Sequence, residues 1–327
     1  MARYLVTGSA GFIGSHVTEL LLERGDTVIG VDNMNEAYDV RLKTFRLELL
    51  ERRPNFSFIR EDIAERSAVE RLFREHAAPR FDAVINLAAR AGVRQSVENP
   101  WVYYDANATG TLNLLEACIR NGIGKFVLAS TSSLYGTHNP RPYAEDADTD
   151  RPLSPYAASK KAAETIAYTY HYLHGIDVTI LRFFTVYGPA GRPDMSLFRF
   201  VQWIAEGKPV LVFGDGQQER DFTYVDDVAR GTIAALAPAG YEIINLGSDR
   251  PIVLMELVRL VEEYTGKKAQ LDHRPRHPAD VTATWANIGK ARRLLNWEPR
   301  TSFADGVRES VAWYERNRDW AREIVTE

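Results

Sequence analysis

Three glycines near the start of the chain constrain its fold more strongly than any other feature. Gly8, Gly11 and Gly14 follow the apolar run at residues 4–7 with three-residue spacing, and helix-like periodicity starts at Gly14. Gly8 allows a tight turn after a strand, Gly11 lets the backbone approach a phosphate group, and Gly14 allows close packing of the helix. Because this spacing differs from the common dinucleotide fingerprint, a purely structural turn explains the glycines by themselves about as well.

Beyond this turn, short apolar runs alternate with helix-like periodicity. Strands are expected at residues 4–7, 27–31, 56–60, 83–87, 125–130 and 178–182, and helices at residues 14–24, 68–76, 105–121 and 156–174. The alternation predicts an α/β fold with a doubly wound parallel (Rossmann) sheet. We expect a Rossmann domain over residues 1–182 and a smaller α/β substrate lobe over residues 183–327, where loops rich in proline and glycine begin. The apolar run at residues 243–246 predicts a strand that rejoins the main sheet.

Composition limits the functions that fit the chain. A formal net charge of −4 and a pI of about 6.0 give no electrostatic footprint for nucleic acid. No apolar run is long enough to span a bilayer, and the first residues leave no room for a signal peptide. The single cysteine, Cys118, lies in a helical pattern and is expected to be buried rather than reactive. We therefore expect a soluble cytoplasmic protein without a membrane partner or a metal site.

A carboxylate at the end of the second expected strand selects the cofactor. Asp32 lies 18 residues beyond Gly14. At that position it accepts hydrogen bonds from the adenosine ribose hydroxyls and repels a 2′-phosphate, which favours NAD over NADP. The other candidate cofactor residues are Phe12, Ile13, Asn33, Asn35, Lys43, Asp62, Ile63, Leu87, Ala88 and Ala89. A solvated loop explains Asn33, Asn35 and Lys43 nearly as well.

Tyr156 and Lys160 form the candidate reactive pair, and both are also candidates for cofactor contact. They are four residues apart on an expected helix and so share one face. An ordinary amphipathic helix produces such a pair often, but this helix follows Thr131, at the strand end where α/β proteins bind ligands. Lowering a phenol pKa by about 3 units takes about 4 kcal/mol, the order that a cation about 4 Å away supplies at an effective dielectric near 20. We expect Lys160 and the oxidised nicotinamide to share this work, and Thr131 to bind the same substrate oxygen.

Together, the glycine turn, Asp32, Tyr156 and Lys160 resemble the extended short-chain dehydrogenase/reductase superfamily, in its nucleotide-sugar epimerase/dehydratase branch. The resemblance covers nearly the whole chain, since the segments 213–216 and 220–227 are similar to the nucleotide-diphosphate site of that branch. It implies an NAD-dependent enzyme that binds a UDP-sugar in the second lobe and forms a homodimer through the helices at residues 105–121 and 156–174.

The same resemblance assigns roles in the second lobe. Arg220 would neutralise the diphosphate, while Leu211 and Phe213 would pack on uracil. The chain departs from the usual pattern at residues 277–280 and at Asn287, which leaves any nucleotide contact of Arg276 open.

The two residues after Thr131, which are serines here, indicate which reaction of the branch the chain would catalyse. Dehydratases of the branch carry an Asp-Glu pair after the threonine, and uronate decarboxylases carry a glutamate at the position of Ser133. This chain has Ser132 and Ser133 there, without either carboxylate. The resemblance therefore implies epimerisation rather than elimination or decarboxylation.

The segments 182–189, 192–195, 32–35 and 91–94, the last ending in Arg94, are similar to the UDP-glucuronate 4-epimerases. That likeness implies an isomerase that interconverts UDP-glucuronate and UDP-galacturonate through a 4-keto sugar, with NAD recycled. The candidate carboxylate pocket is Thr131, Ser132, Ser133, Thr185 and Arg192, because a carboxylate only accepts hydrogen bonds. Local turn capping is the other explanation of the serines. Two functional alternatives stay open: a UDP-glucose/UDP-galactose 4-epimerase, and a non-catalytic regulator that senses NAD.

Overall fold

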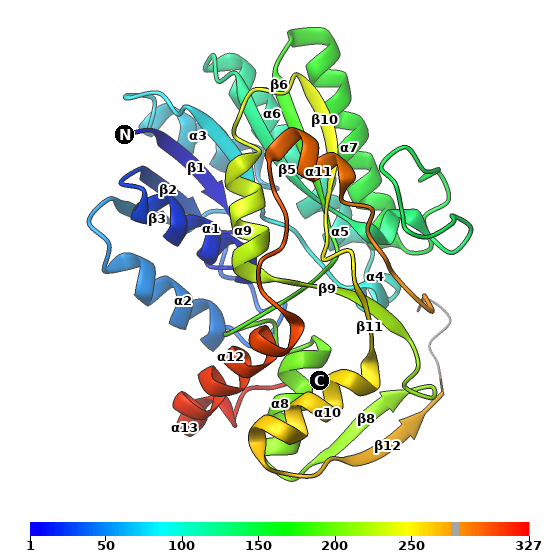
Figure 1. Cartoon of the computed structure of the whole chain (residues 1–327). Helices are drawn as coiled ribbons and strands as arrows, with labels where there is room; N and C mark the ends of the chain where they lie inside the picture. The colour runs from blue at the N-terminus through cyan, green and yellow to red at the C-terminus, as the bar shows by residue number, and fades with distance from the viewer. Residues whose placement is uncertain (276–280, 327) are drawn as a thin grey trace.

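The larger lobe of the protein is built on one parallel sheet (Figure 1). The structure is a computed structural model that describes residues 1–275 and 281–326. The seven strands lie in the order β10-β6-β5-β4-β1-β2-β3. Their bounds are β1 (Arg3–Thr7), β2 (Thr27–Val31), β3 (Phe56–Ile59), β4 (Ala83–Asn86), β5 (Lys125–Thr131), β6 (Asp177–Phe183) and β10 (Tyr241–Leu246). The doubly wound sheet predicted from the alternation is confirmed.

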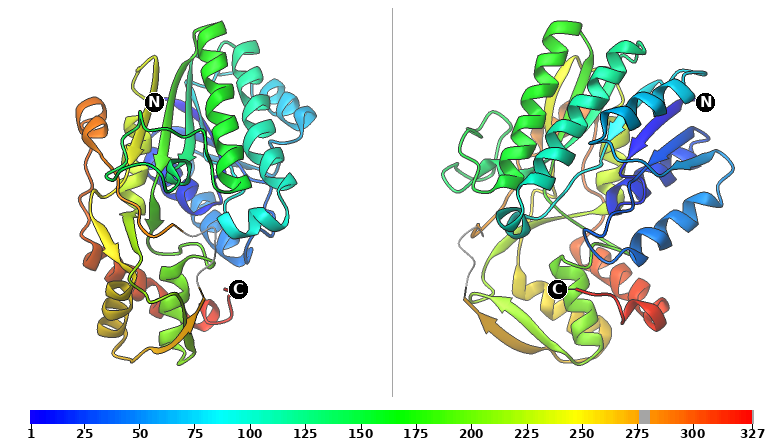
Figure 2. Two further views of the ribbon diagram at one scale, coloured as in Figure 1. Left: turned by 90° about the vertical axis from the view of Figure 1, so that its right-hand side faces the viewer. Right: turned by 180° about the vertical axis from the view of Figure 1, so that it is seen from behind.

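Helices cover both faces of this sheet, as the opposite views in Figures 1 and 2 show. One face carries α1 (Phe12–Glu23), α2 (Arg41–Glu51), α9 (Val225–Ala234) and α11 (Gly289–Leu295); the other carries α3 (Arg66–Glu75), α6 (Gly110–Arg120) and α7 (Pro155–His174). Successive strand residues point to opposite faces, so Tyr4 and Val6 enter one core cluster and Leu5 enters the other. Burial on both sides explains why the strands are continuous apolar runs.

Within the first 130 residues, two regions differ from the helices expected from the sequence. The helix expected over residues 105–121 begins as a π-helical turn, η1 (Asp105–Thr109), which follows the short helices α4 (Val93–Glu98) and α5 (Trp101–Tyr104). Helix α2 was not predicted. Its Lys43 and Arg46 are buried and face the interior of the protein, which breaks the amphipathic pattern that normally reveals a helix.

The second lobe contains two small sheets and four helices among the described residues. The sheets are β7 (Thr185–Tyr187), β9 (Glu219–Tyr224) and β11 (Pro251–Val253), and the pair β8 (Pro209–Phe213) and β12 (Gln270–Arg274). The helices are α8 (Ser196–Ala205), α10 (Leu254–Thr265), α12 (Phe303–Arg316) and α13 (Arg318–Ala321). Buried aromatic side chains such as Phe198, Trp203 and Trp313 fill its core.

The chain beyond Phe183 contributes to both lobes. It builds the second lobe, but α9 packs against α1, and β10 pairs in parallel with β6. The division at residues 182 and 183 therefore stays a prediction about roles, because the two lobes share their chain. Among the described helices, none is long and apolar enough to cross a membrane.

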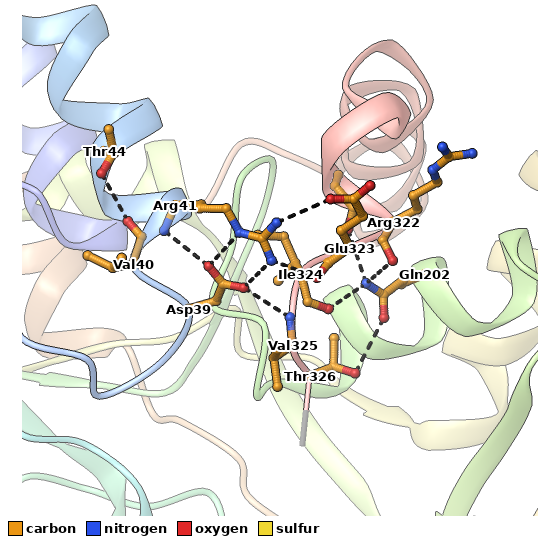
Figure 3. A network of polar contacts seen from close by, with 11 residues as sticks. Asp39, Val40, Arg41, Thr44, Gln202, Arg322, Glu323, Ile324, Val325 and Thr326 are labelled. Atoms are coloured by element: carbon orange, nitrogen blue, oxygen red, sulfur yellow. Dashed lines mark hydrogen bonds and ion pairs between the residues drawn. The ribbon is translucent and has the colours of Figure 1, made fainter.

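The segment after α13 ties the two lobes together (Figure 3). Asp39, in the loop before α2, pairs with Arg41 at 2.7 Å and accepts the Val325 amide at 3.1 Å. On the other side, Gln202 of α8 donates to the Ile324 carbonyl at 2.9 Å. This network fixes the loop of the larger lobe against the helix of the smaller one, and both elements border the space between the lobes.

Candidate active site

A cleft of about 630 Å³ runs between the two lobes at the carboxyl ends of the sheet strands. Each predicted site residue that the structure describes lines this cleft, while Arg276 lies outside the described residues. The lining includes Gly8, Gly11, Phe12, Ile13, Gly14, Asp32, Asn33, Asn35, Lys43, Asp62, Ile63, Leu87, Ala88, Ala89, Arg94, Thr131, Ser132, Ser133, Tyr156, Lys160, Thr185, Arg192, Leu211, Phe213 and Arg220. Residues spread over more than 200 positions of sequence are thus brought to one place.

The glycine turn is a cradle in which side chains do not fit. Gly8 has a φ of +70°, and a Cβ there would lie 2.7 Å from the Ala88 nitrogen. A Cβ on Gly14 would lie 2.0 Å from the Gly8 carbonyl oxygen, so only glycine allows α1 to start this close to β1. The first turn of α1 lines the cleft and directs its amide groups there. This arrangement fits a pyrophosphate, which a helix N-terminus stabilises.

Asp32 is held in place beside the turn by its own loop. Its Oδ1 accepts the Met34 amide at 2.8 Å and the Lys43 ammonium at 3.1 Å, and both charged side chains are buried. Asn35 also accepts from Lys43, at 3.3 Å. Asn33 donates to Asp62 at 2.8 Å. The candidates that a solvated loop would also have explained therefore form one connected polar network at the cleft wall.

The start of α7 positions the reactive pair. Ser154 caps the helix by accepting the Ala157 amide at 3.2 Å, so Tyr156 falls in the first turn and Lys160 one turn later. Ser159 donates to the Tyr156 carbonyl at 2.8 Å and accepts from Asn107 at 2.9 Å, which fixes this turn against η1. Tyr156 is half-buried and Lys160 is only 3% exposed.

Burial and nearby charges shift the pKa values of both Tyr156 and Lys160. Burial raises the pKa of Tyr156, while a hydrogen bond from Thr131 and the charge of Arg192 act in the opposite direction. Burial lowers the pKa of Lys160 to about 8, against the opposing effect of Glu164. Arg192 is thus a protein cation that acts on the phenol in the direction expected of Lys160 and the oxidised nicotinamide, whose shared role stays a prediction. No described residue lies within hydrogen-bond or ion-pair distance of the Lys160 ammonium, which faces the cleft.

The candidate carboxylate pocket combines hydroxyl groups with one guanidinium. Thr131 caps the 3₁₀ helix η2 (Ser132–Tyr135), because its Oγ1 accepts the Ser133 amide at 3.1 Å. Turn capping thus explains Thr131 in part, but the cleft still receives the hydroxyls of Ser132, Ser133 and Thr185.

Arg192 brings a counter-ion that the sequence did not reveal. Its Nε and Nη2 donate to the two oxygens of Asp194 at 3.0 Å and 2.6 Å, and Nη2 also donates to the Ala91 carbonyl at 3.2 Å. Burial works to lower the pKa of Arg192, but Asp194 more than offsets it, and the net direction is upward.

Sequence reasoning missed several residues of the cleft wall. Tyr38 lies close to three cations. Its hydroxyl accepts from Arg46 at 2.9 Å, and its ring centroid is 5.7 Å from the Lys43 ammonium and 5.9 Å from the Arg192 guanidinium carbon. Arg199 and Trp203, four residues apart on α8, also line the cleft. An aromatic residue close to Asn35 was a signal for Tyr38, but α8 reaches the cleft only through the tertiary fold.

Three comparisons place the chain among known proteins. The model of the GDP-mannose 4,6 dehydratase family matches residues 5–310. The chain belongs to this family. Its resemblance to the extended short-chain dehydrogenase/reductases is confirmed by the same match.

Relatives of this family member include proteins with a named activity. A UDP-glucuronate 4-epimerase of Thermodesulfobacterium geofontis (strain OPF15) is 55% identical over 325 residues and 99% of each chain. The crystal structure of the Bacillus cereus UDP-glucuronic acid 4-epimerase, with UDP-glucuronic acid and NAD, has a TM-score of 0.90 and 38% identity over 96% of this chain and 99% of that one. The UDP-glucose 4-epimerase of Thermotoga maritima, with UDP-glucose, has a TM-score of 0.89 and 33% identity over 97% and 99% of the two chains.

Proposed function

We propose that this family member is an NAD-dependent UDP-glucuronate 4-epimerase, which interconverts UDP-glucuronate and UDP-galacturonate. The observation that carries the proposal is the composition of the cleft around Tyr156 and Lys160. Hydroxyl donors and Arg192 gather there, while positions 132 and 133 offer no acid or base for elimination. The named relatives support the same activity.

The cleft fits NAD on its own geometry. The glycine cradle leaves room for a pyrophosphate, Asp32 faces the ribose position, and the buried Lys160 ammonium lacks a partner among the described residues. When bound, NAD supplies the acceptor and the donor of the hydride at C4. Lys160 would then bind the ribose hydroxyls of the nicotinamide end, because an ammonium group donates hydrogen bonds.

Tyr156 moves the proton of the C4 hydroxyl. Its phenolate accepts this proton in one direction and returns it in the other, so no net proton is consumed. Arg192 and Thr131 favour the phenolate against the burial that disfavours it. Thr131 also orients the substrate oxygen toward the phenol, and no residue of the pair changes over a full cycle.

The hydroxyl cluster holds the uronate carboxylate. A 4-keto uronate is a β-keto acid, which loses CO₂ when the carboxylate bond aligns with the carbonyl π system. Donors from Ser132, Ser133 and Thr185 fix the carboxylate from several sides, and we propose that they keep it out of that alignment. Arg192 adds a charge that Asp194 partly balances, which allows the sugar to turn over between two bound orientations.

The second lobe binds the nucleotide in this proposal. The Arg94 guanidinium carbon lies 4.1 Å from the Phe213 ring centroid, so a residue of the larger lobe meets the predicted uracil platform across the cleft. Leu211 and Arg220 line the same part of the cleft, where packing on the base and neutralisation of the diphosphate would take place. A cytoplasmic location and a homodimer, both expected from the sequence, complete the proposal.

The direct experiment is turnover of a panel of UDP-sugars by the purified protein, followed by NMR. Conversion of UDP-glucuronate to UDP-galacturonate, abolished by Tyr156→Phe, supports the proposal. Conversion of UDP-glucose alone identifies a hexose epimerase instead. Binding of NAD without any turnover identifies a non-catalytic regulator.

A further inference from the structure

A buried ion pair lies between α7 and the strands β5 and β6, one helical turn beyond Lys160. Glu164, one turn beyond Lys160, accepts from the Nε and Nη2 of Arg182 at 3.0 Å and 2.8 Å. Ser130 donates to the same carboxylate at 2.5 Å. Glu164 and Arg182 are 3% and 2% exposed. A charged group this deep is costly unless it is paired, so the position of the carboxylate is strongly determined.

The chain connects this ion pair and Ser130 to the reactive groups Thr131 and Lys160. Ser130 and Arg182 are partners in the ladder between β5 and β6. Ser130 immediately precedes Thr131, and Glu164 lies four residues after Lys160 on the same helix. The carboxylate is therefore held between the strand that carries Thr131 and the helix that carries Lys160.

The other titratable groups around the carboxylate are accounted for element by element. Arg182 also donates to the Tyr135 hydroxyl at 3.1 Å and to the Glu145 carbonyl at 3.1 Å. From β10, Tyr241 interacts electrostatically with Glu164, which contributes to its raised pKa of about 12. Tyr135, whose pKa burial raises to about 12, is neutral near neutral pH. Among the described residues, the charges around the carboxylate and its partners thus include Arg182 from β6, Lys160 from α7 and Glu145, which acts on Tyr135 and accepts the Asn245 amide of β10 at 2.9 Å.

A second ion pair on the same two strands provides a comparison. Lys125 and Asp177 pair at the amino ends of β5 and β6, five residues before Ser130 and Arg182. At about 3.3 Å per residue this places them roughly 16 Å from the reactive end of the sheet. They stabilise the same sheet without lying near Lys160, so they separate a structural effect from an electrostatic one.

We propose that Glu164 is a positioning residue which, with Arg182 as its counter-ion, keeps Lys160 charged and sets the field in which Tyr156 releases its proton. The proposal rests on the roles of Tyr156 and Lys160 in the proposed function. Glu164→Gln leaves the Arg182 charge unbalanced, which disfavours an ammonium at Lys160 and favours a phenolate at Tyr156. Both groups then titrate at lower pH, by about one pH unit for a unit charge roughly 10 Å away at an effective dielectric near 20.

The experiment is a pH titration of tyrosinate absorbance in the purified protein with its NAD. The signal of Tyr156→Phe is subtracted in each background, and the pH profile of kcat is recorded in parallel. We expect the Tyr156 midpoint of Glu164→Gln to fall by about one pH unit. Asp177→Asn, the matched control, should leave the midpoint unchanged. The double variant Glu164→Gln/Arg182→Met should shift it by less than half as much as Glu164→Gln.

The double variant separates the proposal from a purely structural role. It disturbs packing more than the single substitution but leaves no charge unbalanced, so a larger shift than in Glu164→Gln would overturn the proposal. An unchanged midpoint in Glu164→Gln would do the same. If Glu164→Gln does not fold, Arg182→Met decides. This substitution leaves the Glu164 carboxylate unbalanced, so a Tyr156 midpoint above that of the parent supports the proposal, and an identical midpoint overturns it.

The titration does not depend on turnover. A parent protein that epimerises UDP-glucuronate, with no shift in Glu164→Gln, contradicts this inference and leaves the proposed function standing. If Glu164→Gln shows the expected shift but the parent protein epimerises no UDP-sugar, the proposed function is contradicted. The effect of the Glu164 charge on the Tyr156 midpoint is then still supported.

Discussion

Asp194 binds Arg192 through hydrogen bonds of 3.0 Å and 2.6 Å, so the guanidinium that acts on Tyr156 has its own counter-ion. The two substitutions of this pair have different consequences. Arg192→Met removes a charged donor from the carboxylate pocket and should reduce the preference for UDP-glucuronate over UDP-glucose by at least about tenfold, the effect of one hydrogen bond to a charged group. Asp194→Asn keeps the cation and should retain the preference. If both variants lost the same amount of preference, measured as the ratio of kcat/KM for UDP-glucuronate to that for UDP-glucose, the ion pair would only stabilise the local structure.

We predict that the buried ammonium of Lys160 lowers the free energy of unfolding of the NAD-free protein. Its pKa falls from 10.5 to about 8 on folding, so the folded state binds this proton less tightly than the unfolded state does. Stability therefore rises with pH across that window, and the full cost is present below it. In the NAD-free protein, Lys160→Met should raise the free energy of unfolding at neutral pH by about 3 kcal/mol. Urea denaturation at several pH values measures this gain, which should shrink between pH 8 and 10.5. A gain that is independent of pH would exclude the buried ammonium as its cause.

Much of the fold and site was predictable because its signals are local. The glycine turn, Asp32, and the spacing of Tyr156 and Lys160 each depend on neighbouring residues in one strand–turn–helix unit. In contrast, the partners of Arg182 and the approach of α8 to the cleft are set by tertiary packing, which periodicity does not record. Helix α2 escaped prediction for the same reason, since its buried cations are explained only by the groups they meet.

Asp32 should decide between the two nicotinamide cofactors. Its carboxylate, held by Lys43 and the Met34 amide, lines the cleft, and we predict that it lies where NADP would carry a 2′-phosphate. We expect NAD to be released when the purified protein is denatured, and Asp32→Asn to lose NAD more readily and to discriminate less against NADP. Cofactor analysis by chromatography measures both effects, with Asp177→Asn, which lies outside the cleft, as the control. A parent protein that carries NADP would refute the role of Asp32.

The helices α6 and α7 should form the contact between two subunits. Large side chains are exposed on them and on the adjoining α5, including Tyr172 at 76% and Trp101 at 77%. Light scattering should give twice the 36.9 kDa mass of the chain, and Leu112→Arg on α6 should shift the protein toward the monomer. A monomer at micromolar concentration in the unmodified protein would contradict the homodimer.

The ratio of kcat/KM for UDP-glucuronate to that for UDP-glucose tests the uronate assignment most directly. A site built to hydrogen-bond a group rejects an analogue that lacks it, by up to about 10⁴ or more, since its polar groups are left unpaired. We predict a strong preference for UDP-glucuronate, which Thr185→Val should weaken while releasing some CO₂ from the loosely held keto acid. Equal values of kcat/KM for the two sugars in the unmodified protein would contradict the account and identify a hexose epimerase.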